Sequence, residues 1–127
     1  MKGIRSLSFW KRNPNSVESV YRLTLKPSQD GYTMVTSDEN GEKKRNLSTN
    51  EVNSLLNLLF VSYDLDHTEE QYKAYKYENN PNDFNLKFFL EIDFKDYTYL
   101  CIKGLHPFKQ PHFKEIMDTF SPLIEGK

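Results

Sequence analysis

The stretch FNLKFFLEIDFKDYTYLCIKGL, residues 84–105, decides the fold of this chain. In its first half every second residue is apolar, and these residues share one face of an extended backbone: Phe84, Leu86, Phe88, Leu90, Ile92 and Phe94. The positions between them are polar or charged, except for Phe89. This alternation is the pattern of a strand that is covered on one face and open to water on the other. A turn at Lys95-Asp96 and a return strand over residues 97–103 complete a predicted hairpin.

Four more strands are predicted in front of this hairpin, over residues 4–11, 17–26, 32–37 and 42–46. Asn40-Gly41 joins the last two, and both residues accept the left-handed conformations of a two-residue hairpin turn. The last strand is short and strongly charged, which is typical of an outer strand that is protected against pairing with other chains.

A helix is predicted directly after these strands. Ser48 as N-cap and Glu51 three residues later form a capping box. Apolar residues then recur at helical spacing, at Val52, Leu55, Leu56 and Leu59, with Leu58 and Val61 widening the stripe. We expect this stripe to be buried against the sheet.

A second helix is predicted toward the end of the chain. Gly104 is expected to end the preceding strand, and Pro111 suits a first helical position. The apolar residues that follow have the spacing of a helix that covers a sheet: Phe113, Ile116, Met117 and Phe120. Ser121-Pro122 should stop or kink this helix, because proline lacks the backbone N–H that a helix interior needs.

Residues 64–83, between the first helix and the hairpin, differ in character. They contain six acidic residues, two lysines and three tyrosines, and we expect an irregular acidic segment here. Antiparallel hairpins with helices on one side make an α+β fold. The sequence therefore predicts a single domain over residues 1–127, an antiparallel sheet of about five to six strands with two helices packed on one face (a two-layer sandwich).

Cysteine content and apolar runs indicate a compartment. The single cysteine among 127 residues excludes a disulfide within the chain, which suits a reducing environment. The N-terminal residues lack the apolar run of a signal peptide, and no apolar stretch is long enough to cross a membrane. We therefore expect a cytoplasmic protein with no membrane partner.

Charge is distributed unevenly along the chain, although its net value is only -1. Residues 1–50 contain nine Lys and Arg against five Asp and Glu, whereas residues 51–127 contain eight against thirteen. A general nucleic-acid-binding protein shows a basic excess on one surface, so the near-neutral total argues against that class. One candidate basic strip is left, formed by Lys43, Lys44 and Arg45 with Lys11 and Arg12.

An enzymatic function has few candidate residues. No nucleotide-binding glycine loop, nucleophile elbow or paired-cysteine metal motif occurs, so no cofactor is expected. Cys101 lies within a strand, where a small buried side chain is its expected role. The alternative function is a metal-dependent hydrolase or a small-molecule-binding protein that uses two histidines and the acidic cluster at 64–70: His106, His112, Asp64, Asp66, Glu69 and Glu70.

Aromatic side chains set among charged ones favour a different function. If the helices cover the apolar face of the sheet, Trp10 and Phe89 lie on the opposite face, with Tyr97 or Tyr99 on or near it. We therefore predict a small non-enzymatic protein-binding domain, for instance an inhibitor or immunity-type protein that blocks a partner protein. The predicted partner-binding residues are Trp10, Phe89, Asp64, Asp66, Glu69, Glu70, Tyr72 and Tyr75. A homodimer through the open sheet face is a second way to cover that face.

Overall fold

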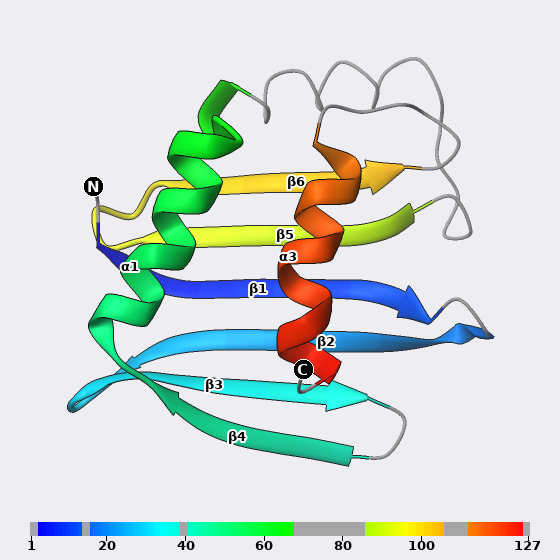
Figure 1. Ribbon diagram of the computed structural model, residues 1–127, viewed down its shortest axis with the longest axis horizontal. Coiled ribbons are helices and arrows are strands. Elements are labelled where there is room, and N and C mark those ends of the chain that lie inside the picture. The colour runs from blue at the N-terminus through cyan, green and yellow to red at the C-terminus, as the bar shows by residue number, and fades with distance from the viewer. Residues whose placement is uncertain (1–2, 14–15, 39–40, 68–85, 106–111, 126–127) are drawn as a thin grey trace.

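The chain forms one six-stranded antiparallel sheet, shown in Figure 1 as a computed structural model. The structure describes residues 3–13, 16–38, 41–67, 86–105 and 112–125. The strands are β1 (Ile4–Asn13), β2 (Ser16–Ser28), β3 (Gly31–Asp38), β4 (Gly41–Leu47), β5 (Leu86–Phe94) and β6 (Tyr99–Leu105). Their order across the sheet is β4-β3-β2-β1-β5-β6, so the predicted 84–105 hairpin pairs through β5 with the first strand of the chain.

In the described part of the chain, two helices of nine or more residues lie across the same face of this sheet (Figure 1), which confirms the predicted α+β sandwich. They are α1 (Thr49–Asn57), which continues into the short π-helix η1 (Leu58–Ser62), and α3 (Phe113–Glu125). The predicted capping box begins α1. The backbone N–H of Glu51 donates to the Ser48 hydroxyl, and the Glu51 carboxylate accepts from the Ser48 backbone N–H, both at 3.1 Å.

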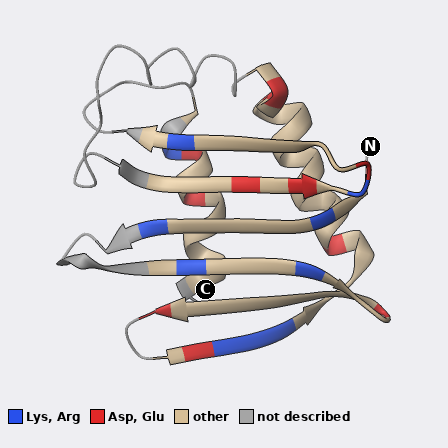
Figure 2. Cartoon of the chain, turned by 180° about the vertical axis from the view of Figure 1, so that it is seen from behind, with Lys and Arg blue, Asp and Glu red and all other residues tan. Residues whose placement is uncertain are grey.

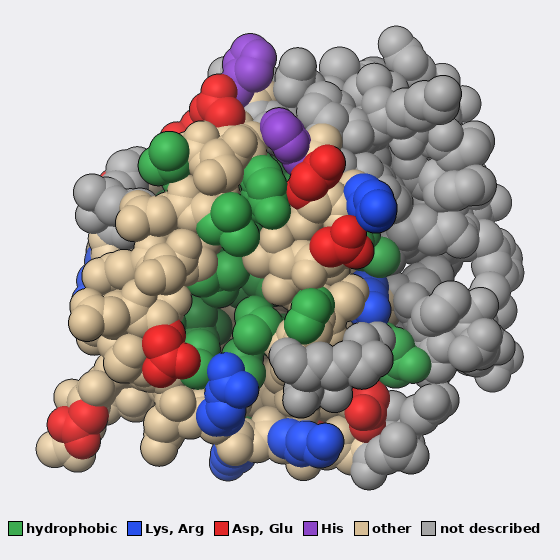
Figure 3. Space-filling model, in the orientation of Figure 1, with side chains coloured by type: hydrophobic (Ala, Val, Ile, Leu, Met, Phe, Trp, Pro, Cys, Tyr) green, Lys and Arg blue, Asp and Glu red, His purple; other side chains and the backbone are tan. Residues whose placement is uncertain are grey.

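The core between sheet and helices is built around three phenylalanines. Phe120 of α3 stacks on Phe9 of β1 with ring centroids 4.4 Å apart, and Phe9 stacks in turn on Phe88 of β5 at 5.9 Å. All three side chains are fully buried. Figure 3 shows further hydrophobic side chains gathered on and between the two helices.

Among the side chains that the structure describes, one charged group is buried within this core layer. Lys11 lies on the helix side of β1, where its Nζ donates to the Ser121 hydroxyl of α3 at 2.8 Å and lies 5.3 Å from the centre of the Tyr21 ring. The predicted basic strip is therefore wrong in including Lys11, because the period of two turns this side chain away from the solvent-facing side of its strand.

The helix interpretations need two corrections. Leu58 and Val61 are 37% and 74% exposed and do not belong to the buried stripe, because they fall on the far side of the helix from Leu56 and Leu59. Pro122 does not end α3, which continues to Glu125. Ile124 beyond the proline is buried in the core, and that burial favours continuing the helix past the missing N–H.

The β5–β6 hairpin differs from its prediction at both ends. Residues 95–98 form the turn, and Tyr97 lies within it at a positive φ of 68°, so the return strand begins only at Tyr99. The Asp96 carboxylate accepts bonds from the Thr98 backbone N–H and hydroxyl, which fixes this longer turn. At the other end Gly104 does not terminate β6 but pairs with Phe88 inside the ladder.

Candidate functional site

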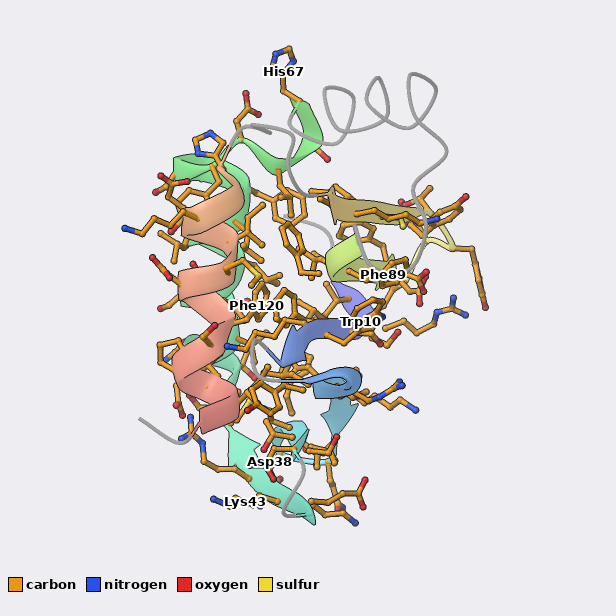
Figure 4. The ribbon with its side chains drawn as sticks, turned by 90° about the vertical axis from the view of Figure 1, so that its right-hand side faces the viewer. Trp10, Asp38, Lys43, His67, Phe89 and Phe120 are labelled. Carbon is orange, nitrogen blue, oxygen red and sulfur yellow. The ribbon has the colours of Figure 1, made fainter. Side chains whose placement is uncertain are left out.

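The side of the sheet opposite α1 and α3, here called the open face, is the candidate functional surface. Figure 2 views the molecule from this side, and the described helices lie behind the strands. Strand register places the following side chains on this face: Ser8, Trp10, Arg22, Thr24, Lys26, Val35, Phe89, Glu91, Asp93, Tyr99, Cys101 and Lys103. Figure 4 shows Phe120 between helix and sheet, with Trp10 and Phe89 on the other side of the strands.

The centre of the open face is an aromatic pair. Trp10 of β1 and Phe89 of β5 are direct cross-strand partners, with ring centroids 6.2 Å apart and ring planes within 10° of parallel. Both side chains are partly buried and partly exposed. Stacked aromatic residues on neighbouring strands form a rigid apolar platform, because few side-chain torsions remain free.

Cations flank this platform on both sides. Arg22 of β2 is the cross-strand partner of Trp10, and Lys103 of β6 is the partner of Phe89. Four adjacent strands therefore carry a single row across the sheet, which we call the central row: Arg22, Trp10, Phe89 and Lys103. Aromatic residues and arginine are the side chains most enriched where proteins bind one another.

Two carboxylates follow the platform along β5. Glu91 and Asp93 share the open face, and Asp93 accepts a hydrogen bond of 3.0 Å from the hydroxyl of Ser6. The pKa of Glu91 is raised from its ordinary value of 4.5 by partial desolvation and then by the charge of Asp93 and a hydrogen bond to it. All three effects disfavour the ionised form of Glu91.

The raised pKa of Glu91 gives a testable dependence of stability on pH. The folded chain binds a proton at Glu91 more readily than the unfolded chain, so this group's contribution to stability is lost as the pH rises above about 4.5. Glu91→Gln should therefore be more stable than wild type at pH 7, by up to about 0.5 kcal/mol because solvent screens the repulsion. The difference should vanish at pH 4.

Urea denaturation at several pH values measures this effect. Glu42→Gln, which removes a carboxylate from exposed β4, is the control for the change in net charge. An equal gain in stability in both variants, or a gain in stability from Glu91→Gln that persists at pH 4, contradicts the raised pKa of Glu91.

The edge of the open face near the β5–β6 turn contains two tyrosines. Tyr99 lies on the open face as the cross-strand partner of Asp93, and its side chain is 68% exposed. Tyr97 is 81% exposed at the tip of the turn, and the guanidinium of Arg5 lies 5.0 Å from its ring centre. The prediction that one of these tyrosines lies on or near the open face is confirmed by Tyr99.

Lys43, Lys44 and Arg45, the part of the predicted basic strip on β4, point to both sides of that strand. The Arg12 side chain lies outside what the structure describes. Lys43 and Arg45 pair with Thr36 and Met34, which face the helices, whereas Lys44 pairs with Val35 on the open face. The three cations therefore do not form a strip on one surface. They do lie on an outer strand of the sheet, as their charge predicted.

The residues of the alternative, metal-dependent function are only partly described. His112 stacks on Tyr63 at 5.4 Å, and its Nδ1 lies 4.0 Å from the Glu115 carboxylate. Asp64 and Asp66 are exposed beside this region, and His67 extends into solvent (Figure 4). Within the described ranges no three His, Cys, Asp or Glu side chains are grouped to hold a metal ion.

Several predicted residues lie outside the described part of the chain: Glu69, Glu70, Tyr72, Tyr75 and His106. Of the predicted partner-binding residues, the structure therefore brings together Trp10 and Phe89. Arg22 and Lys103 were not among the predicted residues, although the alternation of polar and apolar residues in their own strands places both on the open face. Cys101 was expected to be buried, but it is half-buried on the open face, where it pairs with Glu91.

No helix among the described residues has the length and apolar composition needed to cross a membrane. No family model, no curated protein and no solved structure matches this chain.

Proposed function

We propose that this chain is a small non-enzymatic protein-binding domain that docks another protein on the open face of its sheet. The central row is the observation that carries this proposal: a stacked Trp10–Phe89 pair between Arg22 and Lys103, on a side of the sheet without described helices. Aromatic anchors with a charged rim are typical of protein-binding surfaces. An inhibitor or immunity-type protein, which blocks a partner by covering it, uses a surface of this kind.

The mixture of charges favours a protein over a nucleic acid as the partner. Arg22, Lys26 and Lys103 share the open face with Glu91 and Asp93 (Figure 2). A phosphate backbone is uniformly negative, and the carboxylates beside the platform would repel it. A protein surface presents both signs and can match both.

Substitution at the aromatic platform tests the proposal. Affinity capture with the wild-type chain, followed by reconstitution with the purified partner, gives a dissociation constant. Trp10→Ala should weaken binding roughly tenfold to a hundredfold, because a truncated hot-spot side chain costs about 2 kcal/mol or more. A differently tagged copy of this same chain belongs among the candidate partners.

Val61→Ala is the matched control, since Val61 is an exposed apolar residue on the helix side. It should bind as wild type does. A partner that is lost with Val61→Ala and retained with Trp10→Ala would place the docking surface on the helices and refute the proposal.

A further inference from the structure

We infer that the occupant of the open face is a second copy of this chain, related by a two-fold axis that runs along β1. This inference rests on the proposed docking function and names its partner. The reason is a self-complementary arrangement of charge on the two strands that flank β1.

The flanking strands carry opposite charges on the open face. On one side of β1, strand β2 presents Arg22 and Lys26, and on the other side β5 presents Glu91 and Asp93. Figure 2 shows Lys and Arg positions in blue on β2 and Asp and Glu positions in red on β5, on the two sides of β1. A rotation of 180° about an axis along β1 exchanges these two sides, so that the β5 of one copy lies over the β2 of the other.

Register decides which residues then meet. Asp93 pairs with Ser6 of β1. On the other side of β1, Leu25 pairs with Leu7 in antiparallel register, so the next residue of β2, Lys26, lies beside Ser6. Asp93 and Lys26 therefore lie at the same level along the sheet. The rotation places each Asp93 opposite the Lys26 of the other copy. Packed sheets lie about 10 Å apart, a gap that a lysine and an aspartate side chain span together.

The central row is self-complementary under the same rotation. Trp10 lies on the axis strand and meets its own copy, while Arg22 and Phe89 are its partners on either side. Arg22 of one copy therefore lies over Phe89 of the other, which is a favourable cation–π arrangement. Asp93 and Lys26, Arg22 and Phe89, and the two copies of Trp10 thus face one another across the axis, which is the arrangement of an isologous interface.

The open face is also large enough for a stable dimer interface. Six strands spaced about 4.8 Å apart, each 7–13 residues long, give a face of roughly 25 Å by 25 Å. With side-chain relief this is comparable with the approximately 800 Å² that each partner contributes to a stable interface.

Charge reversal at the two contacts tests the geometry by sedimentation or light scattering across a concentration series. Wild type should dimerise, and Asp93→Lys or Lys26→Asp alone should weaken the dimer at least about tenfold, because each puts like charges together at both contacts. The double variant should recover dimerisation. An equimolar mixture of the two single variants should recover it too, since a lysine then faces an aspartate at both contacts.

Lys114→Glu, an exposed change on α3, is the matched control and should dimerise as wild type does. Circular dichroism confirms that each variant is folded. A dimer that neither single variant weakens, or a mixture that does not recover dimerisation, overturns the inference. If wild type stays monomeric but binds a different protein through Trp10, this inference fails and the proposed function stands. If it stays monomeric and binds nothing through Trp10, both fail.

Discussion

Phe120→Ala should lower the free energy of unfolding by about 3–5 kcal/mol, a large part of the roughly 5–15 kcal/mol that stabilises a typical domain. The Phe120 ring is fully buried and stacks on Phe9 with centroids 4.4 Å apart. Its removal leaves a cavity between α3 and the sheet, and the surrounding core, which includes Phe9 and Phe88, can collapse into that cavity only in part. Urea denaturation of the purified variant measures the loss.

The same substitution on the other face of the sheet is the control. Phe89 is only partly buried, so Phe89→Ala should cost about 1 kcal/mol, mainly from the lost stacking on Trp10. The difference between the two variants in the loss of unfolding free energy measures how much more deeply the helix side of the sheet is buried than the open face. Equal losses would mean that the face carrying Phe89 is as deeply covered as the core, and the docking proposal would lose its surface.

Gly104→Ala should destabilise the protein by about 3 kcal/mol, although it adds a single methyl group to a strand. Gly104 is the direct cross-strand partner of Phe88, and a Cβ at this position would overlap the Cε2 and Cδ2 atoms of the Phe88 ring. That ring is fully buried and stacks on Phe9, so it has no free space into which to turn. Thermal or urea denaturation reports the change.

A second substitution separates this overlap from any effect of alanine on the strand itself. Phe88→Leu shortens the side chain that the new methyl group meets. Phe88→Leu should therefore lower the free energy of unfolding less in the Gly104→Ala background than in wild type. Strictly additive losses in the double variant would show that the methyl group and the ring do not compete for the same space.

Local sequence patterns predict much of this fold. The alternation in 84–105 assigns Phe88 and Ile92 to the buried side of β5 and Phe89 to the other side, as the structure confirms. The capping box at Ser48 marks the beginning of α1. These predictions succeed because strand faces and helix caps depend on residues within a few positions of one another.

Three of the errors occur where the decisive contact is with a segment distant in sequence. Gly104 reads locally as a strand end, yet it pairs with Phe88 within β6, and the Phe88 ring fills the space that a side chain at this position would need. Pro122 reads as a helix stop, yet α3 continues to bury Ile124. Lys11 reads as part of a surface strip, although its partner is Ser121 at the other end of the chain.

The sequence by itself determined the α+β class and the presence of Trp10 and Phe89 on one side of a sheet, because a two-residue period is a property of each strand alone. Only the tertiary structure decided that β5 returns to pair with β1, which stacks these two rings between Arg22 and Lys103. Strand order and register depend on contacts between distant segments, and a period within one strand carries no information about its neighbour. The charges on both sides of β1 become complementary only in that order.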